Sequence, residues 1–158
     1  RFKGKRNIDW EDVENYLKEY VGKCYEVVET ADQVFIGNDF PAELKGSEDT
    51  KRLCSANAKA KANATQKIPT LLKCATNKRW QENFKGKHKV DAKYGWYRFT
   101  TRFALPVYSS DLKEVERFNI YRIEMLIRHA ADGNLYLYDM VNIKKETSTL
   151  FQSEDITQ

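Results

Sequence analysis

The sequence has few cysteines and no long apolar run. A membrane helix needs about 20 consecutive apolar residues. No stretch of the 158 residues approaches that length, and none resembles the apolar part of a signal peptide. Cys24, Cys54 and Cys74 are odd in number and lack paired spacing, which argues against a disulfide framework and against a zinc site. We therefore expect a globular chain that contacts no membrane, with simple buried or surface thiols that suit a reducing compartment.

Common catalytic motifs are also missing. The sequence has no Walker loop, no G-x-G-x-x-G, no H-E-x-x-H and no H-x-E paired with C-x-x-C. Its two histidines, His88 and His129, are isolated, and no acidic cluster accompanies them. Nothing places the cysteines beside a histidine as in a cysteine protease. We therefore expect no metal and no cofactor.

The overall composition is that of one folded domain. Hydrophobic residues make up 41% of the chain, aromatic residues 13% and charged residues 32%. A length of 158 residues suffices for one buried core. We expect residues 1–158 to form a single monomeric domain. Because the sequence begins with Arg1 and not with methionine, we also expect it to be a piece of a longer polypeptide.

Positive charge is concentrated in one segment. The whole chain carries a formal net charge of +4, whereas residues 85–102 contain six basic residues and one acid, which gives 6 − 1 = +5. The six are Lys85, Lys87, Lys89, Lys93, Arg98 and Arg102. Clustered cations bind polyanions by releasing their counterions, so nucleic acid is the first partner to consider.

The first half of the sequence, about residues 9–84, has helical patterns. Asp9 is a candidate N-cap for a helix with an apolar stripe that runs from Trp10 to Tyr20. Residues 47–66 predict a second helix that begins after Ser47, and residues 68–84 predict a third with Pro69 in its first turn. Residues 24–40 are ambiguous between a short hairpin and separate strands.

From Tyr94 the apolar residues alternate with period two, as in β-strands. Further strands are predicted from Phe118 to His129 and from Leu135 to Lys145, joined by a tight turn at Asp132-Gly133. A two-residue turn there pairs Leu126 with Asp139, Glu124 with Val141 and Arg122 with Ile143. The predicted core face carries Tyr121, Ile123, Met125, Ile127, Tyr138 and Met140.

These patterns predict an α+β fold. The helices of residues 9–84 pack on one face of an antiparallel meander of about four strands in residues 94–149. The other face is expected to carry Arg98, Thr100, Arg102 and Arg122. Continued alternation adds Lys145, Thr147 and Thr149 to that face, and places Lys144, Glu146 and Ser148 on the core side. The alternative is that these polar residues are only a solvated exterior.

Such a face has the groups that RNA cleavage without a metal needs. A base removes the 2′-hydroxyl proton, an acid protonates the leaving 5′-oxygen, and cations stabilise the charge on the phosphate. His88 lies between Lys87 and Lys89, and these cations favour its neutral form, which a base needs. It is equally compatible with an exposed basic loop, and His129 is expected to be structural. Aromatic residues that can stack on bases or fill the core are Trp96, Tyr97 and Tyr136.

The segments "KHKVDAKYGWYRFTTRFALPVY" and "LYLYDMVNIKKETST" resemble nuclease-like domains of the barnase–EndoU–colicin–RelE superfamily. These domains occur in polymorphic toxins and in polyvalent proteins of mobile elements, and they combine helices with a four-stranded antiparallel sheet. The resemblance covers residues 85–149 by motif and the first half only by architecture. It implies a metal-independent endoribonuclease that acts on RNA, including tRNA, in the bacterial cytoplasm. It also implies delivery as a toxin domain and neutralisation by a cognate immunity protein.

Carried over residue by residue, the resemblance implies the following roles. His88 is the acid or base, and Arg98 or Arg102 binds phosphate together with Arg122. Lys145 with Thr147 or Ser148 stabilises the transition state or positions the scissile phosphate, and Lys87, Lys89 and Thr100 contact the substrate. We therefore expect cleavage to a 2′,3′-cyclic phosphate. The alternatives are a non-catalytic RNA- or DNA-binding module and, with least support, a protein-interaction domain that binds through a sheet edge.

Overall fold

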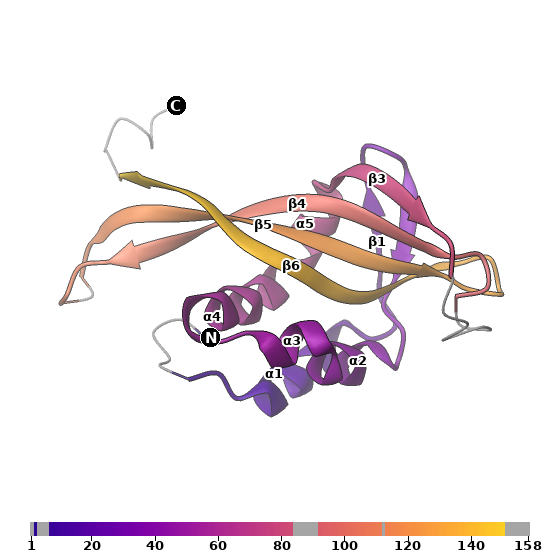
Figure 1. Cartoon of the computed structure of the whole chain (residues 1–158), viewed down its shortest axis with the longest axis horizontal. Coiled ribbons are helices and arrows are strands. Elements are labelled where there is room, and N and C mark those ends of the chain that lie inside the picture. Colours follow the sequence, from indigo (N-terminus) through magenta and orange to yellow (C-terminus); the bar gives the residue numbers. More distant parts are fainter. Residues whose placement is uncertain (1, 3–6, 84–91, 112, 151–158) are drawn as a thin grey trace.

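The chain folds as helices packed on one mixed β-sheet (Figure 1). The computed structural model describes residue 2 and residues 7–83, 92–111 and 113–150. The helices are α1 (Trp10–Leu17), η1 (Lys18–Tyr20), α2 (Phe40–Gly46), α3 (Glu48–Arg52), α4 (Ser55–Ala64), η2 (Thr65–Lys67) and α5 (Ile68–Lys73). The strands are β1 (Cys24–Val27), β2 (Asp32–Phe35), β3 (Thr76–Gln81), β4 (Trp96–Tyr108), β5 (Val115–His129) and β6 (Leu135–Leu150). Within these residues, no helix is both long enough and apolar enough to span a membrane.

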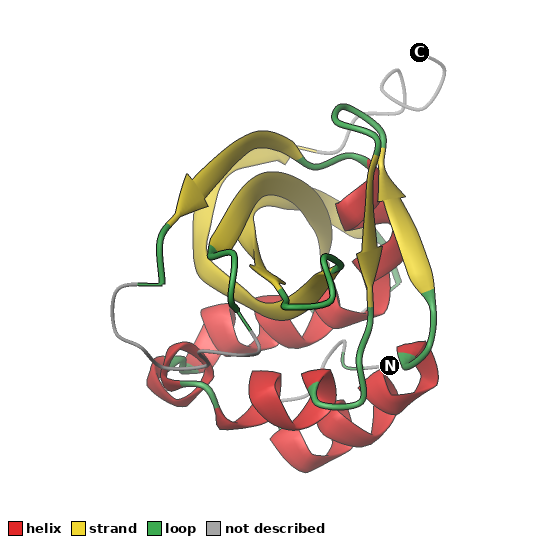
Figure 2. Cartoon of the chain, turned by 90° about the vertical axis from the view of Figure 1, so that its right-hand side faces the viewer, coloured by secondary structure: helices red, strands yellow, loops and turns green. Residues whose placement is uncertain are grey.

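The sheet has the strand order β1-β2-β6-β5-β4-β3. Strands β3 to β6 form an antiparallel meander, which confirms the α+β class. The prediction of about four strands within residues 94–149 is met only roughly, because those residues supply β4, β5 and β6, and the fourth strand of the meander is β3 at residues 76–81. The β1–β2 hairpin extends this meander, and β2 pairs in parallel with the beginning of β6. The ambiguous segment at residues 24–40 is therefore a hairpin. Figure 2 shows how strongly the long strands coil, with helices lying along one side of them.

The predicted helix starts at Asp9 and Ser47 are confirmed. The Asp9 carboxylate accepts a hydrogen bond from the Glu11 amide, and the Ser47 hydroxyl accepts one from the Thr50 amide. The helix predicted over residues 47–66 is interrupted, however. The backbone is extended at Leu53 and Cys54, so α3 ends at Arg52 and α4 begins at Ser55.

The prediction of one helix over residues 68–84 is wrong. Helix α5 ends at Lys73, and residues 76–81 form β3 at the edge of the sheet. Pairing with β4 overrides the helical pattern of this segment, since Arg79, Trp80 and Gln81 lie opposite Arg98, Tyr97 and Trp96. The "helical half" of the sequence therefore contributes three strands to the sheet.

The core lies between the helices and one face of the sheet. Tyr121, Ile123, Met125 and Ile127 of β5 are buried there, as the alternation predicts, and so is Met140 of β6. Tyr138 is not part of this row. It is only partly buried and packs edge-on against Trp96, with ring centroids 5.0 Å apart. Tyr138 is the extra residue of the first bulge in β6, between Leu137 and Asp139.

The pairing of β5 with β6 changes register three times. Leu126 lies opposite Asp139 and Glu124 opposite Val141, as predicted. The turn spans Ala130–Asn134 and not two residues, and a bulge between Leu137 and Asp139 restores the predicted register. A second bulge includes Asn142, whose φ is 56°. It places Arg122 opposite Lys144, so the predicted Arg122–Ile143 pair is wrong. The third shift lies between Lys145 and Thr147.

Candidate nucleic-acid interface

One face of the meander gathers arginines from three strands. Arg79 of β3 lies opposite Arg98 of β4, and Arg102 of β4 lies opposite Arg122 of β5. Residues directly opposite each other on antiparallel strands point to the same side of the sheet. We call this surface the arginine face: Arg79, Arg98, Thr100, Arg102, Arg122, Glu124, Lys144, Glu146 and Thr147. Along β5, the residues of the arginine face alternate with the buried residues Tyr121, Ile123 and Met125. The arginine face therefore lies on the side of the sheet away from the core.

At one end of the arginine face, three side chains meet the carboxylate of Glu124. Arg98 and Arg79 each donate to it at 3.0 Å, one to each oxygen, and the Asn142 amide donates at 2.8 Å. Arg79 also donates to the Thr100 hydroxyl at 3.1 Å. These contacts fix two guanidinium groups side by side with only one carboxylate between them, which leaves a net charge of 2 − 1 = +1.

At the other end, Arg102 forms an ion pair with Glu146 at 2.6 Å. The hydrogen bond from Arg102 lowers the pKa of Glu146 below its usual value, and Arg122 and Lys144 add to that effect through their positive charge. Within the described part of the chain, Arg122 and Lys144 have no carboxylate partner of their own. They are therefore the cations of this face that are available to an incoming anion.

The arginine face is positively charged as a whole. Its five basic residues, Arg79, Arg98, Arg102, Arg122 and Lys144, outnumber Glu124 and Glu146, which gives 5 − 2 = +3. Guanidinium groups match phosphate oxygens in geometry and form strong charge-assisted hydrogen bonds with them. A row of such groups across three adjacent strands suits a phosphodiester backbone better than a single small anion.

The predicted residues from β4 and β5 come together on this face, but two from β6 do not. Lys145 lies opposite Tyr121, on the core side, so its predicted place beside the arginines is wrong. Ser148 lies opposite Asn119, also on the core side, as the alternation predicts. The bulge at Asn142 inverts the alternation, and Lys144 occupies the place predicted for Lys145. The next shift brings Thr147 opposite Ile120 and back to the arginine face, where it was predicted.

Of the residues predicted in the basic loop, His88, Lys87 and Lys89 lie outside the described residues. The other histidine, His129, lies at the end of β5. Its ring packs near Tyr94 and Tyr97, with centroids 5.1 and 5.8 Å away, and its Nε2 is 3.2 Å from the Gly133 carbonyl oxygen.

Sequence reasoning missed Arg79, Lys144 and Asn142. Arg79 was missed because residues 76–81 were assigned to a helix, although Thr76 is a weak strand signal. Asn142 carried a usable signal, since asparagine is one of the few residues that tolerate a positive φ.

Among the described residues, no group of three histidine, cysteine, aspartate or glutamate side chains is placed to hold a metal ion. No protein-family model matches the sequence, and no curated protein or solved structure matches it significantly.

Proposed function

We propose that this protein is a metal-independent endoribonuclease whose arginine face holds the phosphodiester backbone of RNA. The observation that carries the proposal is the convergence of five cations from four strands on one sheet face, with Arg122 and Lys144 not paired to any described carboxylate. Guanidinium groups in this arrangement neutralise the charge that a phosphate gains when a nucleophile attacks it.

The reaction needs no external reagent. The ribose 2′-oxygen attacks the adjacent phosphorus, the bond from phosphorus to the 5′-oxygen breaks, and a 2′,3′-cyclic phosphate and a 5′-hydroxyl result. A base accepts the 2′-hydroxyl proton and an acid returns a proton to the 5′-oxygen. In this proposal Arg98, Arg102, Arg122 and Lys144 hold the phosphate oxygens, Thr147 donates a hydrogen bond, and the sequence-predicted His88 transfers a proton.

A second function, RNA binding without cleavage, is favoured by a specific observation. Both carboxylates of the arginine face are already ion-paired with arginines, Glu124 with Arg79 and Arg98, and Glu146 with Arg102. The oxygens of Glu124 are thus already occupied by donors, and the lowered pKa of Glu146 makes that carboxylate a weak base. The described histidine, His129, packs against aromatic rings instead of lying on this face.

Incubation of the purified protein with total RNA in EDTA separates these two functions. Cleavage by the wild type that yields 2′,3′-cyclic phosphate ends, and that is lost in His88→Ala and reduced in Arg122→Gln, supports the nuclease. Intact RNA together with salt-sensitive binding supports the binding module. A chain that neither cleaves nor binds RNA would refute both.

A further inference from the structure

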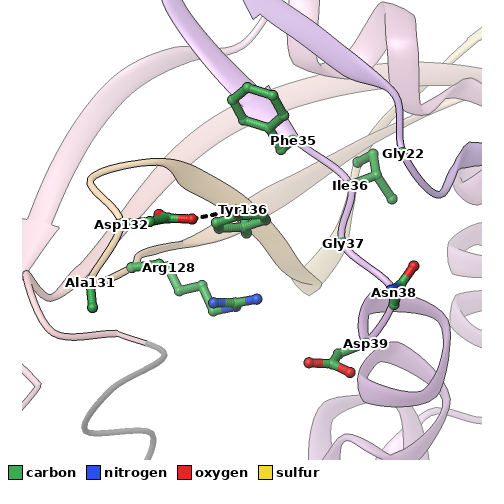
Figure 3. A pocket seen from close by; sticks show the side chains of 11 residues that line it. Gly22, Phe35, Ile36, Gly37, Asn38, Asp39, Arg128, Ala131, Asp132 and Tyr136 are labelled. Carbon is green, nitrogen blue, oxygen red and sulfur yellow. Dashed lines mark hydrogen bonds between the residues drawn. The ribbon is translucent and has the colours of Figure 1, made fainter.

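A polar cavity lies beyond the arginine face, at the turn between β5 and β6 (Figure 3). It has a volume of about 620 Å³ and is formed by the end of β2, the residues that lead into α2, and the β5–β6 turn. Its charged and aromatic lining consists of Phe35, Asp39, Arg128, Asp132 and Tyr136. This volume lies in the range of pockets that bind small organic molecules.

Arg128 presents a flat cationic surface to this cavity. Its guanidinium carbon lies 4.5 Å from the centre of the Tyr136 ring, and Phe35 packs on the same ring at 6.0 Å. The Tyr136 hydroxyl donates to Asp132 at 2.6 Å, and Asp132 also accepts from the Asn134 amide at 2.8 Å. The hydrogen bonds thus fix the tyrosine, and the tyrosine orients the arginine. Arginine planes and aromatic rings are the surfaces on which proteins stack unpaired bases.

The carboxylate of Asp39 lies on the wall of the cavity opposite Arg128 and can accept further hydrogen bonds. Figure 3 shows the Asp39 side chain pointing toward the Arg128 guanidinium from the opposite wall. Asp39 precedes α2 but makes no side-chain hydrogen bond to that helix. Among the described residues its carboxylate has no hydrogen-bond or ion-pair partner, whereas the carboxylate of Asp132 has two donors. Asp39 is thus the acceptor in this cavity that is open to a ligand.

Gly37 keeps the cavity wide. A Cβ atom at this position would lie 3.4 Å from Cδ1 of Tyr136 and 3.8 Å from Nη2 of Arg128. A larger side chain would therefore extend into the space beside the guanidinium group. Because the φ of Gly37 is not positive, such a side chain strains the backbone little, and the position can be used to block the cavity.

Arg128 in the cavity belongs to the same row of β5 side chains as the arginine face. Arg122, Glu124, Leu126 and Arg128 alternate on the same side of that strand, and Arg128 lies opposite Trp96 of β4 and Tyr136 of β6. At about 3.4 Å per residue, Arg122 and Arg128 are roughly 20 Å apart. A short single strand whose phosphates contact Arg122 can therefore place one of its bases in the cavity.

From this geometry we infer that the cavity is a base-binding subsite that selects guanine in the RNA held by the arginine face. Guanine stacks on the Arg128 plane and donates its N1 and N2 hydrogens to the two oxygens of Asp39. Adenine and cytosine have only an exocyclic amino group to offer on this edge, and uracil has only its ring N–H. This inference rests on the proposed RNA binding, and good bidentate contacts of this kind discriminate between bases by about 5- to 150-fold.

The test uses labelled hexanucleotides with 2′-O-methyl riboses, which cannot undergo transesterification. The four oligonucleotides are hexauridylate (U6) and three variants of it that carry guanine, adenine or cytosine at the third position. Their binding to the protein is measured by fluorescence anisotropy. We expect the guanine strand to bind at least about 5-fold more tightly than the others. Asp39→Asn should abolish this preference, and Gly37→Val should do so by occlusion. Glu29→Gln, which removes an exposed carboxylate in the β1–β2 turn, is the charge-matched control and should retain the preference.

The outcomes separate the subsite from the proposed function. Tight, salt-sensitive binding of all four strands with equal affinity would leave the arginine face supported and overturn the subsite. A guanine preference that survives in Asp39→Asn would also overturn it. Guanosine 5′-monophosphate that binds as tightly as the guanine strand would show that the cavity serves free nucleotides and would overturn its link to the arginine face. No binding of any strand would overturn both proposals.

Discussion

The buried ion cluster around Lys61 offers the sharpest test of how this fold is stabilised. The Lys61 side chain in α4 is fully buried, and its Nζ lies 2.9 Å from Asp49 and 3.1 Å from Asp139. Removing one partner of a buried ion pair leaves an uncompensated charge and costs about 3–5 kcal/mol. Since whole domains are stable by only about 5–15 kcal/mol, Lys61→Met should remove a large part of the stability.

The cost should depend on pH in a defined direction. Burial raises the pKa of Asp139, and the charge of Lys61 opposes this rise. A carboxyl group with a raised pKa binds more protons in the folded chain than in the unfolded chain, so its contribution to stability is lost as pH rises through the folded pKa. Without Lys61 that pKa rises further, and the cost of Lys61→Met should be larger at pH 8 than at pH 5.

Urea unfolding followed by tryptophan fluorescence at both pH values measures this cost. Lys59→Met in the same helix removes the same charge from a residue with no buried partner, and it should change stability by about 0.5 kcal/mol or less. In the double variant Lys61→Met/Asp139→Asn the loss should be smaller than the sum of the single losses, because no orphaned charge remains at Asp139. A cost of Lys61→Met below about 1 kcal/mol, equal at both pH values, would refute the reasoning.

Three further predictions concern the sheet and its arginine face. Gly95→Ala should lower the unfolding free energy by about 1–3 kcal/mol more than Gly22→Ala. Both glycines have a positive φ, but only at Gly95 would a Cβ atom come within 2.6 Å of Trp80 and 2.7 Å of Gln81. Equal losses in the two variants would contradict this prediction. Arg122→Gln should reduce the dependence of log RNA affinity on log salt by about 0.7, whereas Lys59→Gln should leave it unchanged. Glu124→Gln should tighten RNA binding in filter-binding assays, since it frees Arg79 and Arg98 from their shared carboxylate; weaker binding would mean that Glu124 positions the arginines more than it neutralises them.

The regular features of this fold were predictable from local sequence patterns. Asp9 and Ser47 mark helix starts because their side chains bond amides only two or three residues away. The buried row of β5, from Tyr121 to Ile127, follows from strict alternation in a half-buried strand. These signals depend on neighbours in the chain, and a single sequence contains them.

The bulges of β6 were not predictable, because contacts from distant segments accompany them. The backbone N–H of Asn142 donates to Asp49 of α3 at 3.1 Å. Burial, together with a hydrogen bond with Glu43 of α2, raises the pKa of Tyr138. Both contacts join residues about 95 positions apart in the sequence. A bulge changes which side chains share a face. One unrecognised bulge was therefore enough to predict Lys145 on the arginine face, where the structure has Lys144.

The neighbouring residues Lys144 and Lys145 provide the most direct test of the central claim that RNA binds the arginine face. Lys144→Gln and Lys145→Gln remove the same charge from adjacent positions, but only Lys144 lies opposite Arg122. In an anisotropy titration with uncleavable RNA, we expect Lys144→Gln to weaken binding and to reduce its salt dependence, while Lys145→Gln leaves both unchanged. Equal effects of the two substitutions, or a larger effect of Lys145→Gln, would contradict the account.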